Sequence, residues 1–147
     1  IAVGQKEGAS LALGGKQIMQ NTGGFYVEPT IFDEVKPDMR IAQEEVFGPV
    51  LVITPFDTEQ EAIEIANGTD FGLVAGVFGE SLNQTLRVAQ QLRGGQVFIN
   101  EWFAGGIETP FGGVGLSGFG REKGQEAIYS YVQTRNIAIR LQQDSNV

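Results

Sequence analysis

Three apolar runs alternate with two helix-like segments in the middle of the chain, and this order constrains the fold more than any other feature. The apolar runs cover residues 50–53, 73–78 and 96–99, and each is short enough to be a strand. Strands separated by single helices form parallel pairs with right-handed crossovers. The sequence therefore predicts an α/β fold, with an open and mainly parallel sheet built around a βαβαβ core.

Both intervening segments carry the sequence signature of a helix start. Thr58 and Glu61 have the spacing of a capping box, in which the threonine hydroxyl accepts from the backbone of the third helical residue. Ser81 and Gln84 repeat that spacing, and Gly68 is placed to end the first segment. These signals predict helices that follow Thr58 and Ser81.

The last part of the chain changes its pattern. Residues 121–132 are expected to form a helix, and residues 135–141 alternate apolar with polar side chains. Ile137, Ile139 and Leu141 share one face in that alternation, which is typical of a strand with one solvated face. Such a strand at a chain end is suited to pairing with an edge on another subunit.

The composition excludes several kinds of chemistry. The 147 residues include no cysteine and no histidine, so thiol nucleophiles, disulfides, imidazole bases and the usual zinc ligands are absent, and no metal site is expected. A net charge of −8 argues against a broad basic surface for nucleic acid. No apolar stretch has the length of a membrane span, and a cysteine-free chain suits the cytoplasm, where we expect this protein.

An acidic turn precedes the first apolar run. Glu44 and Glu45 are followed by Val46, Phe47 and a Gly-Pro pair, and proline restricts the residue before it, so this segment cannot lie inside a helix. Adjacent carboxylates are most often a solvated surface. In a turn that feeds a buried strand, a carboxylate can also accept from two hydroxyl groups, and an aromatic ring can pack on a planar heterocycle. The residues alone allow either a solvated surface or a clamp for ribose and nicotinamide.

A glycine-rich loop follows the third apolar run. Residues 113–118 read G-x-G-x-x-G, a pattern that binds dinucleotides when it lies directly between a strand and its helix. Here a long loop that includes Pro110 separates it from the strand, so we favour a loop folded tightly against a site. Trp102 and Phe111 in this loop are interpreted either as core aromatics or as walls of an apolar substrate tunnel.

Several stretches of the chain together resemble the C-terminal part of an aldehyde dehydrogenase. They are residues 24–30, 43–50, 67–73 and 110–122, and they occur at the family's spacing. The resemblance implies an incomplete form of that family's catalytic-domain fold, and NAD- or NADP-dependent oxidation of an aldehyde to a carboxylic acid. It also implies a homo-oligomer, because family members are dimers or tetramers.

The resemblance further implies roles for five residues. Glu45 would bind the hydroxyl groups of the nicotinamide ribose, Phe47 would pack beside the nicotinamide, and Leu73 would lie near the same end of the cofactor. Phe111 would form a wall of the aldehyde tunnel, with Trp102 as its neighbour.

The same resemblance divides the chain and limits its chemistry. Residues 1–133 correspond to the C-terminal portion of the catalytic domain, and residues 134–147 to the terminal oligomerisation strand and tail. The family's nucleophile is a cysteine, so no catalytic residue is assigned here, and the chain alone is expected to be a fragment without turnover. A non-catalytic assembly module, or a nucleotide-binding module that uses residues 113–118, is the alternative.

Overall fold

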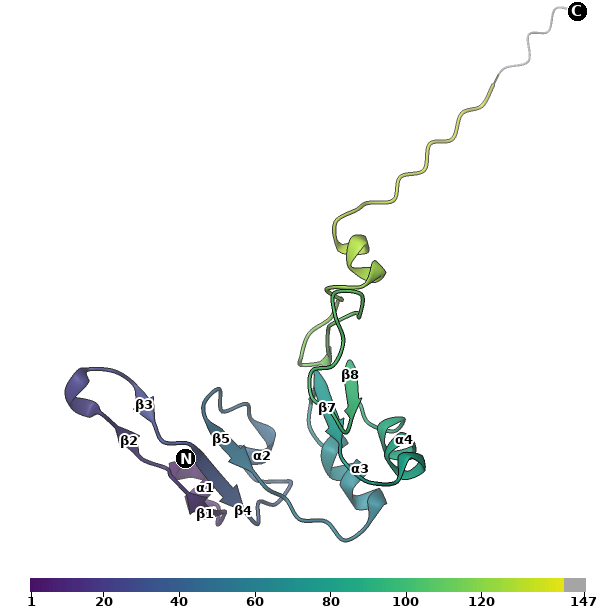
Figure 1. The fold of residues 1–147 in the computed structure, drawn as a ribbon. Coiled ribbons are helices and arrows are strands. Elements are labelled where there is room, and N and C mark those ends of the chain that lie inside the picture. The colour runs from purple at the N-terminus through teal and green to yellow at the C-terminus, as the bar shows by residue number, and fades with distance from the viewer. Residues whose placement is uncertain (142–147) are drawn as a thin grey trace, which may run out of the picture.

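The N-terminal part of the chain, residues 1–56, forms a first lobe (Figure 1). The computed structural model describes residues 1–141 of the chain. The elements of the first lobe are α1 (Ala2–Lys6), β1 (Ser10–Leu13), β2 (Gln17–Ile18), the 3-10 helix η1 (Gln20–Thr22), β3 (Tyr26–Val27), β4 (Thr30–Asp33), α2 (Arg40–Gln43) and β5 (Val50–Val52).

A three-stranded sheet of order β1-β4-β5 holds the first lobe together. Strand β4 lies antiparallel to β1 and parallel to β5, and β2 and β3 form a separate hairpin. Phe32 on β4 is fully buried and sits at the centre of the lobe's apolar core. The other buried members of this core are Ala9, Val35, Met39 and Ile41.

Residues 57–132 form a second lobe, which a linker near residue 56 joins to the first (Figure 1). Its elements are α3 (Glu59–Asn67), β6 (Phe71–Gly72), β7 (Val74–Val77), α4 (Leu82–Ala89), β8 (Gln96–Ile99), β9 (Val114–Gly115) and the 3-10 helix η2 (Gln125–Ser130). Strands β7 and β8 are parallel and in register over four residues each, and α4 packs against both. The predicted strand–helix–strand unit at 73–99 is therefore confirmed.

The two predicted helix starts are also confirmed. The Thr58 hydroxyl accepts from the Glu61 backbone N–H at 3.1 Å, and the Ser81 hydroxyl accepts from the Gln84 N–H at 3.4 Å. The Glu61 carboxylate reaches back to the Asp57 N–H at 2.8 Å, which satisfies one more donor at the start of α3.

The expected single sheet with a βαβαβ core is not what the described residues form. Strand β5 pairs with β4, and the hydrogen bond from the Ile53 N–H to the Phe32 carbonyl continues that ladder. No strand within residues 1–141 pairs with the other edge of β5, and β7 pairs only with β8. Leu51 in the run at 50–53 is 57% exposed, so this strand is not buried on both faces. The observed architecture is a mixed α/β arrangement of small separate sheets.

The predicted helix over 121–132 is wrong. Glu122 instead forms an antiparallel bridge with Phe111, with reciprocal N–H···O bonds of 2.7 Å. Lys123 and Gly124 follow with φ values of 57° and 59°, which a right-handed helix does not allow. Only residues 125–130 then coil, as the exposed 3-10 helix η2.

The predicted strand over 135–141 is also not formed. Within the described chain, residues 133–141 run away from the second lobe in extended form and have no strand partner (Figure 1). A strand needs a second backbone to complete its hydrogen bonds, and none is present beside this segment. The remainder of the predicted tail, residues 142–147, lies outside the described residues.

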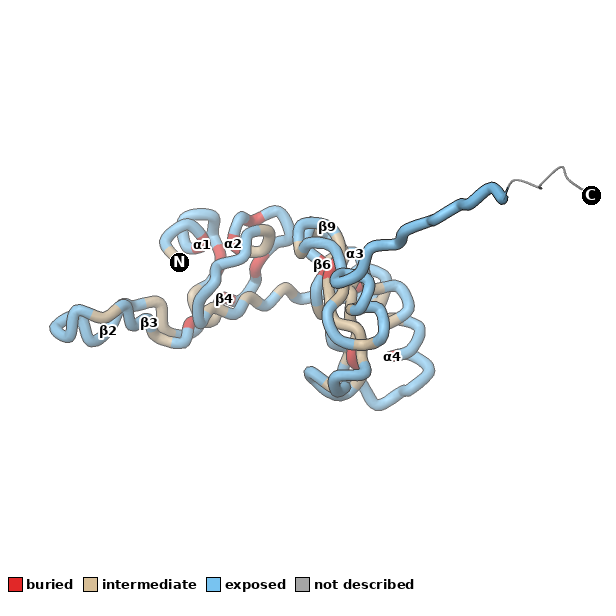
Figure 2. The backbone as a smooth tube through the Cα atoms, turned by 90° about the horizontal axis from the view of Figure 1, so that it is seen from above, coloured by how far each residue is buried: buried red, intermediate tan, exposed pale blue. Residues whose placement is uncertain are grey.

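Most of the chain is exposed, as the pale blue trace of Figure 2 shows, and many of the exposed residues are large and apolar. Examples are Phe25, Phe47, Phe119 and Tyr131, together with Ile139 in the extended tail. Contiguous exposed apolar surface and unpaired strand edges favour association with other polypeptides. No helix within residues 1–141 is long and apolar enough to cross a membrane.

Replacing Thr58 with alanine should destabilise the chain by about 1 kcal/mol, because the substitution removes the hydroxyl that caps α3. Equilibrium urea unfolding measures the effect. Thr134→Ala is the matched control, since Thr134 is exposed in the extended tail and its side chain makes no hydrogen bond within the described residues. Equal stability losses in the two variants would contradict the capping role.

The 147-residue chain should self-associate, because its apolar side chains and strand edges are exposed. Sedimentation velocity over a range of concentrations tests this expectation. Replacing Ile137, Ile139 and Leu141 together with serine should lower the associated fraction. A single monomeric species at every concentration of the unsubstituted chain would contradict it.

Candidate functional site

A hollow of about 580 Å³ lies where the two lobes meet, and it is here named the inter-lobe hollow. The first lobe lines it with the end of α2 and the acidic turn, including Glu45. The second lobe contributes the end of α3, β6 and the start of β7, including Leu73, and the glycine-rich loop, including Ser117. The structure therefore brings Glu45 and Leu73 to one site, although 28 positions separate them in the sequence.

The two adjacent glutamates of the turn have different surroundings. Glu44 is paired with Arg40 through two charge-assisted hydrogen bonds of 2.9 Å. The hydrogen bonds from the Arg40 guanidinium lower the pKa of Glu44 below its ordinary value. Within residues 1–141, the Glu45 carboxylate has no hydrogen-bond or ion-pair partner. Glu45 is thus the carboxylate that can accept from a ligand.

Phe47 is presented to solvent by the backbone itself. Its φ of 55° lies in the left-handed region, and its side chain is 90% exposed. The following Gly48-Pro49 pair leads into β5, and the Pro49 carbonyl accepts from the Thr30 N–H at 2.8 Å. Left-handed φ is unfavourable for a bulky residue unless neighbouring structure enforces it. The turn holds the ring outward, although Phe47 does not line the inter-lobe hollow.

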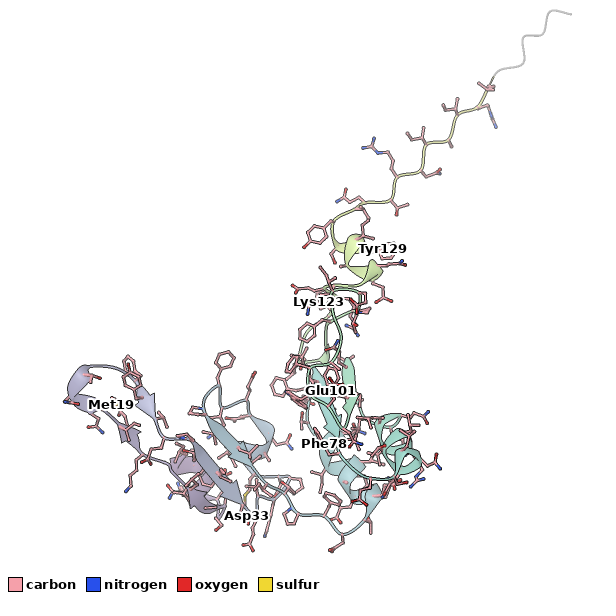
Figure 3. The ribbon with its side chains drawn as sticks, viewed as in Figure 1. Met19, Asp33, Phe78, Glu101, Lys123 and Tyr129 are labelled. Carbon is pink, nitrogen blue, oxygen red and sulfur yellow. The ribbon has the colours of Figure 1, made fainter. Side chains whose placement is uncertain are left out.

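Phe111 lies in a second hollow of about 950 Å³, named here the aromatic hollow. Leu73 and Ser117 line both hollows, so the two adjoin. The ammonium group of Lys123 lies 5.7 Å from the centre of the Phe111 ring. In Figure 3, Lys123 appears between Glu101 and Tyr129 along the second lobe. The bridge to Glu122 fixes the backbone of Phe111, so the ring stays at this wall.

Trp102 belongs to a different group of side chains. Its ring lies 6.2 Å from that of Phe98 and 5.7 Å from that of Phe103, in tilted and edge-on arrangements. Trp102 lines neither hollow. The two aromatic residues expected as tunnel neighbours, Phe111 and Trp102, are therefore not brought to the same hollow in the described chain.

The glycine-rich pattern at 113–118 closes the inter-lobe hollow. Gly115 lies in β9, which pairs with β6, so the pattern does not lie between a strand and its helix as in a dinucleotide-binding loop. The Ser117 hydroxyl accepts from the Gly72 N–H at 3.0 Å. A Cβ on Gly115 would overlap the Asp70 carbonyl oxygen, and its φ of 61° favours glycine. The loop is folded against the inter-lobe hollow, and Gly115 allows the close approach of two backbone segments there.

Sequence reasoning did not single out several polar residues that line the inter-lobe hollow. Gln43, Asn67, Thr69 and Arg93 are the clearest examples. Gln43, Asn67 and Thr69 lie in the stretches 43–50 and 67–73 that carry the resemblance, but none of them was given a role. Arg93 lies outside these stretches. Within the part of the chain that the structure describes, no group of three acidic side chains gathers closely enough to hold a metal ion.

Comparisons with known proteins point to one family. Residues 1–137 match the sequence model of the Aldehyde dehydrogenase family. The chain is 44% identical over 146 residues to retinal dehydrogenase 2 of Gallus gallus, and 47% identical over 133 residues to betaine aldehyde dehydrogenase of Cereibacter sphaeroides. These matches cover 99% and 90% of this chain, but the chain spans only 28% and 27% of those relatives.

Solved structures give the same result. A crystal structure of an indole-3-acetaldehyde dehydrogenase in complex with NAD+ superposes with a TM-score of 0.89 at 50% identity, covering 95% of this chain and 28% of that one. An aldehyde dehydrogenase of Mycobacterium tuberculosis, also complexed with NAD+, superposes with a TM-score of 0.84 at 44% identity, covering 90% and 27%.

Replacing Arg40 with glutamine should raise the pKa of Glu44 towards its ordinary value of 4.5, because the hydrogen bonds that favour the carboxylate are lost. The stabilisation from this pair is present above pH 4.5 and is lost as the pH falls through the lowered pKa of the folded state. Carbon-detected NMR titration of the Glu44 carboxyl group measures the shift. Arg135→Gln, in the extended tail, should leave the pKa of Glu44 unchanged, and an equal shift there would contradict the assignment.

Proposed function

The chain belongs to the aldehyde dehydrogenase family, and from that premise we propose that it supplies the scaffold and part of the coenzyme-binding surface of an enzyme that oxidises an aldehyde to a carboxylic acid with NAD. The bound nicotinamide would supply the hydride acceptor. NADP fits the same surface, because both coenzymes carry the same nicotinamide ribose.

The observation that carries this proposal is the Glu45 carboxylate, which lines the inter-lobe hollow and has no hydrogen-bond or ion-pair partner within residues 1–141. A ribose offers two neighbouring hydroxyl groups, and an ionised carboxylate is an acceptor with two oxygens. Because Arg40 engages Glu44, only one of the two adjacent glutamates remains to accept them. The donor and acceptor chemistry of the turn therefore fits a ribose diol.

Apolar side chains supply the remainder of the proposed coenzyme-binding surface. The exposed Phe47 ring is available to pack on the nicotinamide, and Leu73 lies at the junction of the inter-lobe and aromatic hollows. We assign Phe111 to a wall of the aldehyde route, because it lines the hollow next to Leu73. Trp102 is proposed as an outer neighbour of that route, on the loop that precedes Phe111.

In this proposal the chain corresponds to the C-terminal part of the family. Residues 1–133 would be the end of the catalytic domain, and residues 134–147 the oligomerisation strand and tail of a cytoplasmic homo-oligomer. Ile137 and Ile139 are exposed on extended backbone, which supports the proposal that this segment pairs with a strand of another subunit. The reactive thiol would come from outside this chain, since the chain has no cysteine.

Complementation tests the proposed function. We expect the purified chain alone to produce no NADH from an aldehyde and NAD. Activity should appear when it is mixed or co-expressed with a polypeptide that supplies the part of a related full-length enzyme preceding the matched stretch. Turnover by the chain alone, or rescue only by a polypeptide that follows the matched stretch, would contradict the proposal.

Replacing Glu45 with glutamine should weaken NAD binding to the complemented enzyme by about ten- to a hundredfold, because a hydrogen bond to a charged group contributes about 1.5–3 kcal/mol. Glu44→Gln is the matched control: the neighbouring residue loses the same charge but is occupied by Arg40, so NAD binding should change little. NAD titration by calorimetry measures both. A larger loss for Glu44→Gln than for Glu45→Gln would contradict the assignment.

A further inference from the structure

A single hydrogen bond joins the two lobes within the described chain. It runs from the side-chain amide of Gln43, at the end of α2, to the carbonyl of Gly68, at the end of α3, with a length of 3.0 Å. Among residues 1–141, every other hydrogen bond and both ion pairs lie within residues 1–56 or within residues 57–141. This contact is therefore the one hydrogen bond among the described residues that can fix the position of one lobe relative to the other.

The Gln43 amide makes a second bond from the same nitrogen. Nε2 donates to the Pro37 carbonyl at 2.6 Å as well as to Gly68. Pro37 lies just before α2, so this bond ties the side chain to the segment that enters its own helix. The half-buried amide is thus fixed on the first lobe before it reaches the second.

The acceptor on the second lobe is itself fixed. The neighbouring Asn67 side chain donates to the Gln91 carbonyl at 2.8 Å and accepts from the Arg93 N–H at 2.7 Å. These bonds join the end of α3 to the segment between α4 and β8. The wall of the inter-lobe hollow that Gln43 reaches is consequently a rigid one, and Asn67 and Arg93 both line that hollow.

We propose that Gln43 is a positioning residue, whose amide holds the Glu45 turn at a fixed distance from the Leu73 wall of the inter-lobe hollow. Glu45 follows Gln43 by two residues and lies on the opposite lobe from Leu73. The consequence for coenzyme binding rests on the proposed function of Glu45. The geometric part, that Gln43 holds the lobes together, stands on the hydrogen bonds alone.

The chemistry of an amide explains why glutamine suits this place. The last carbonyl groups of a helix have no partner within the helix, and the Gly68 carbonyl is one of these. One NH₂ group has two donors and can satisfy two carbonyl oxygens at once. A carboxylate of the same shape has no donor, and it would face two carbonyl oxygens beside Glu44 and Glu45.

Spin-label distances in the 147-residue chain test the geometric part. Because the chain contains no cysteine, Ser10→Cys on β1 and Asn83→Cys on α4 place one label on each lobe without competing sites. Both positions are exposed and line neither hollow. Double electron–electron resonance should give one narrow distance distribution with Gln43 present, and a clearly broader one in Gln43→Glu and in Gln43→Met.

Two control variants separate this effect from general destabilisation. Gln60→Glu makes the same isosteric change at an exposed glutamine whose amide bonds only to Glu64 within α3. Thr58→Ala weakens α3 without touching the contact between the lobes. Both should keep the narrow distribution. A narrow distribution in the two Gln43 variants, or equal broadening in the controls, would overturn the proposal.

Kinetics of the complemented enzyme test the consequence for the coenzyme. Gln43→Glu should raise the KM for NAD about tenfold while kcat changes little, because a misplaced Glu45 costs ground-state binding. Glu45→Gln is measured in parallel. If it weakens NAD binding while Gln43→Glu does not, the positioning role is wrong. If neither variant affects NAD, the proposed function of Glu45 is wrong, and the distance distributions still decide whether Gln43 holds the lobes.

Discussion

Backbone hydrogen bonding between parallel strands is the constraint on which this structure depends. The pairs β4–β5 and β7–β8 are short, and each leaves a strand edge open within the described residues. Parallel sheets are ordinarily covered by helices on both faces, and small isolated ones are marginal in water. Neither pair is fully covered here, as the exposed Leu51 side chain illustrates. Anything built between the two pairs therefore depends on the few contacts that hold them relative to each other.

The sequence was sufficient wherever the controlling signal is local. Thr58 and Ser81 cap their helices because the hydroxyl and its acceptor group lie three residues apart in the chain, and that spacing is visible without a structure. The pairing of β7 with β8 follows from a short crossover through α4, which leaves the two strands little freedom. Glu45 and Leu73 were singled out through the family resemblance rather than through a local signal. They line one hollow, and their roles stay predictions.

The sequence was insufficient wherever a distant segment decides the outcome. Residues 121–132 have a helical pattern, but the backbone of Glu122 forms a β-bridge with Phe111. The two residues that follow have left-handed φ values, which a right-handed helix does not allow. Residues 135–141 have a strand pattern, but no backbone within residues 1–141 lies beside them to complete the hydrogen bonds of a strand. Gln43 lies in the stretch 43–50 that carries the resemblance, but it was given no role, since its bond depends on the position of the Gly68 carbonyl, 25 residues away.

In the acidic turn, the spacing of residues on a helix decides which of two adjacent glutamates forms an ion pair. Glu44 and Glu45 are chemically the same, and their neighbours in the turn do not say which one is available. Arg40 precedes Glu44 by four residues, and on a helix that spacing puts an arginine and a glutamate side by side. Glu45 lies one residue beyond this spacing and after the end of α2, where Glu44 already has extended backbone angles, and it makes no ion pair with Arg40. Both glutamates line the inter-lobe hollow, but Glu44 is held by Arg40, and Glu45 is the one whose carboxylate has no partner within residues 1–141.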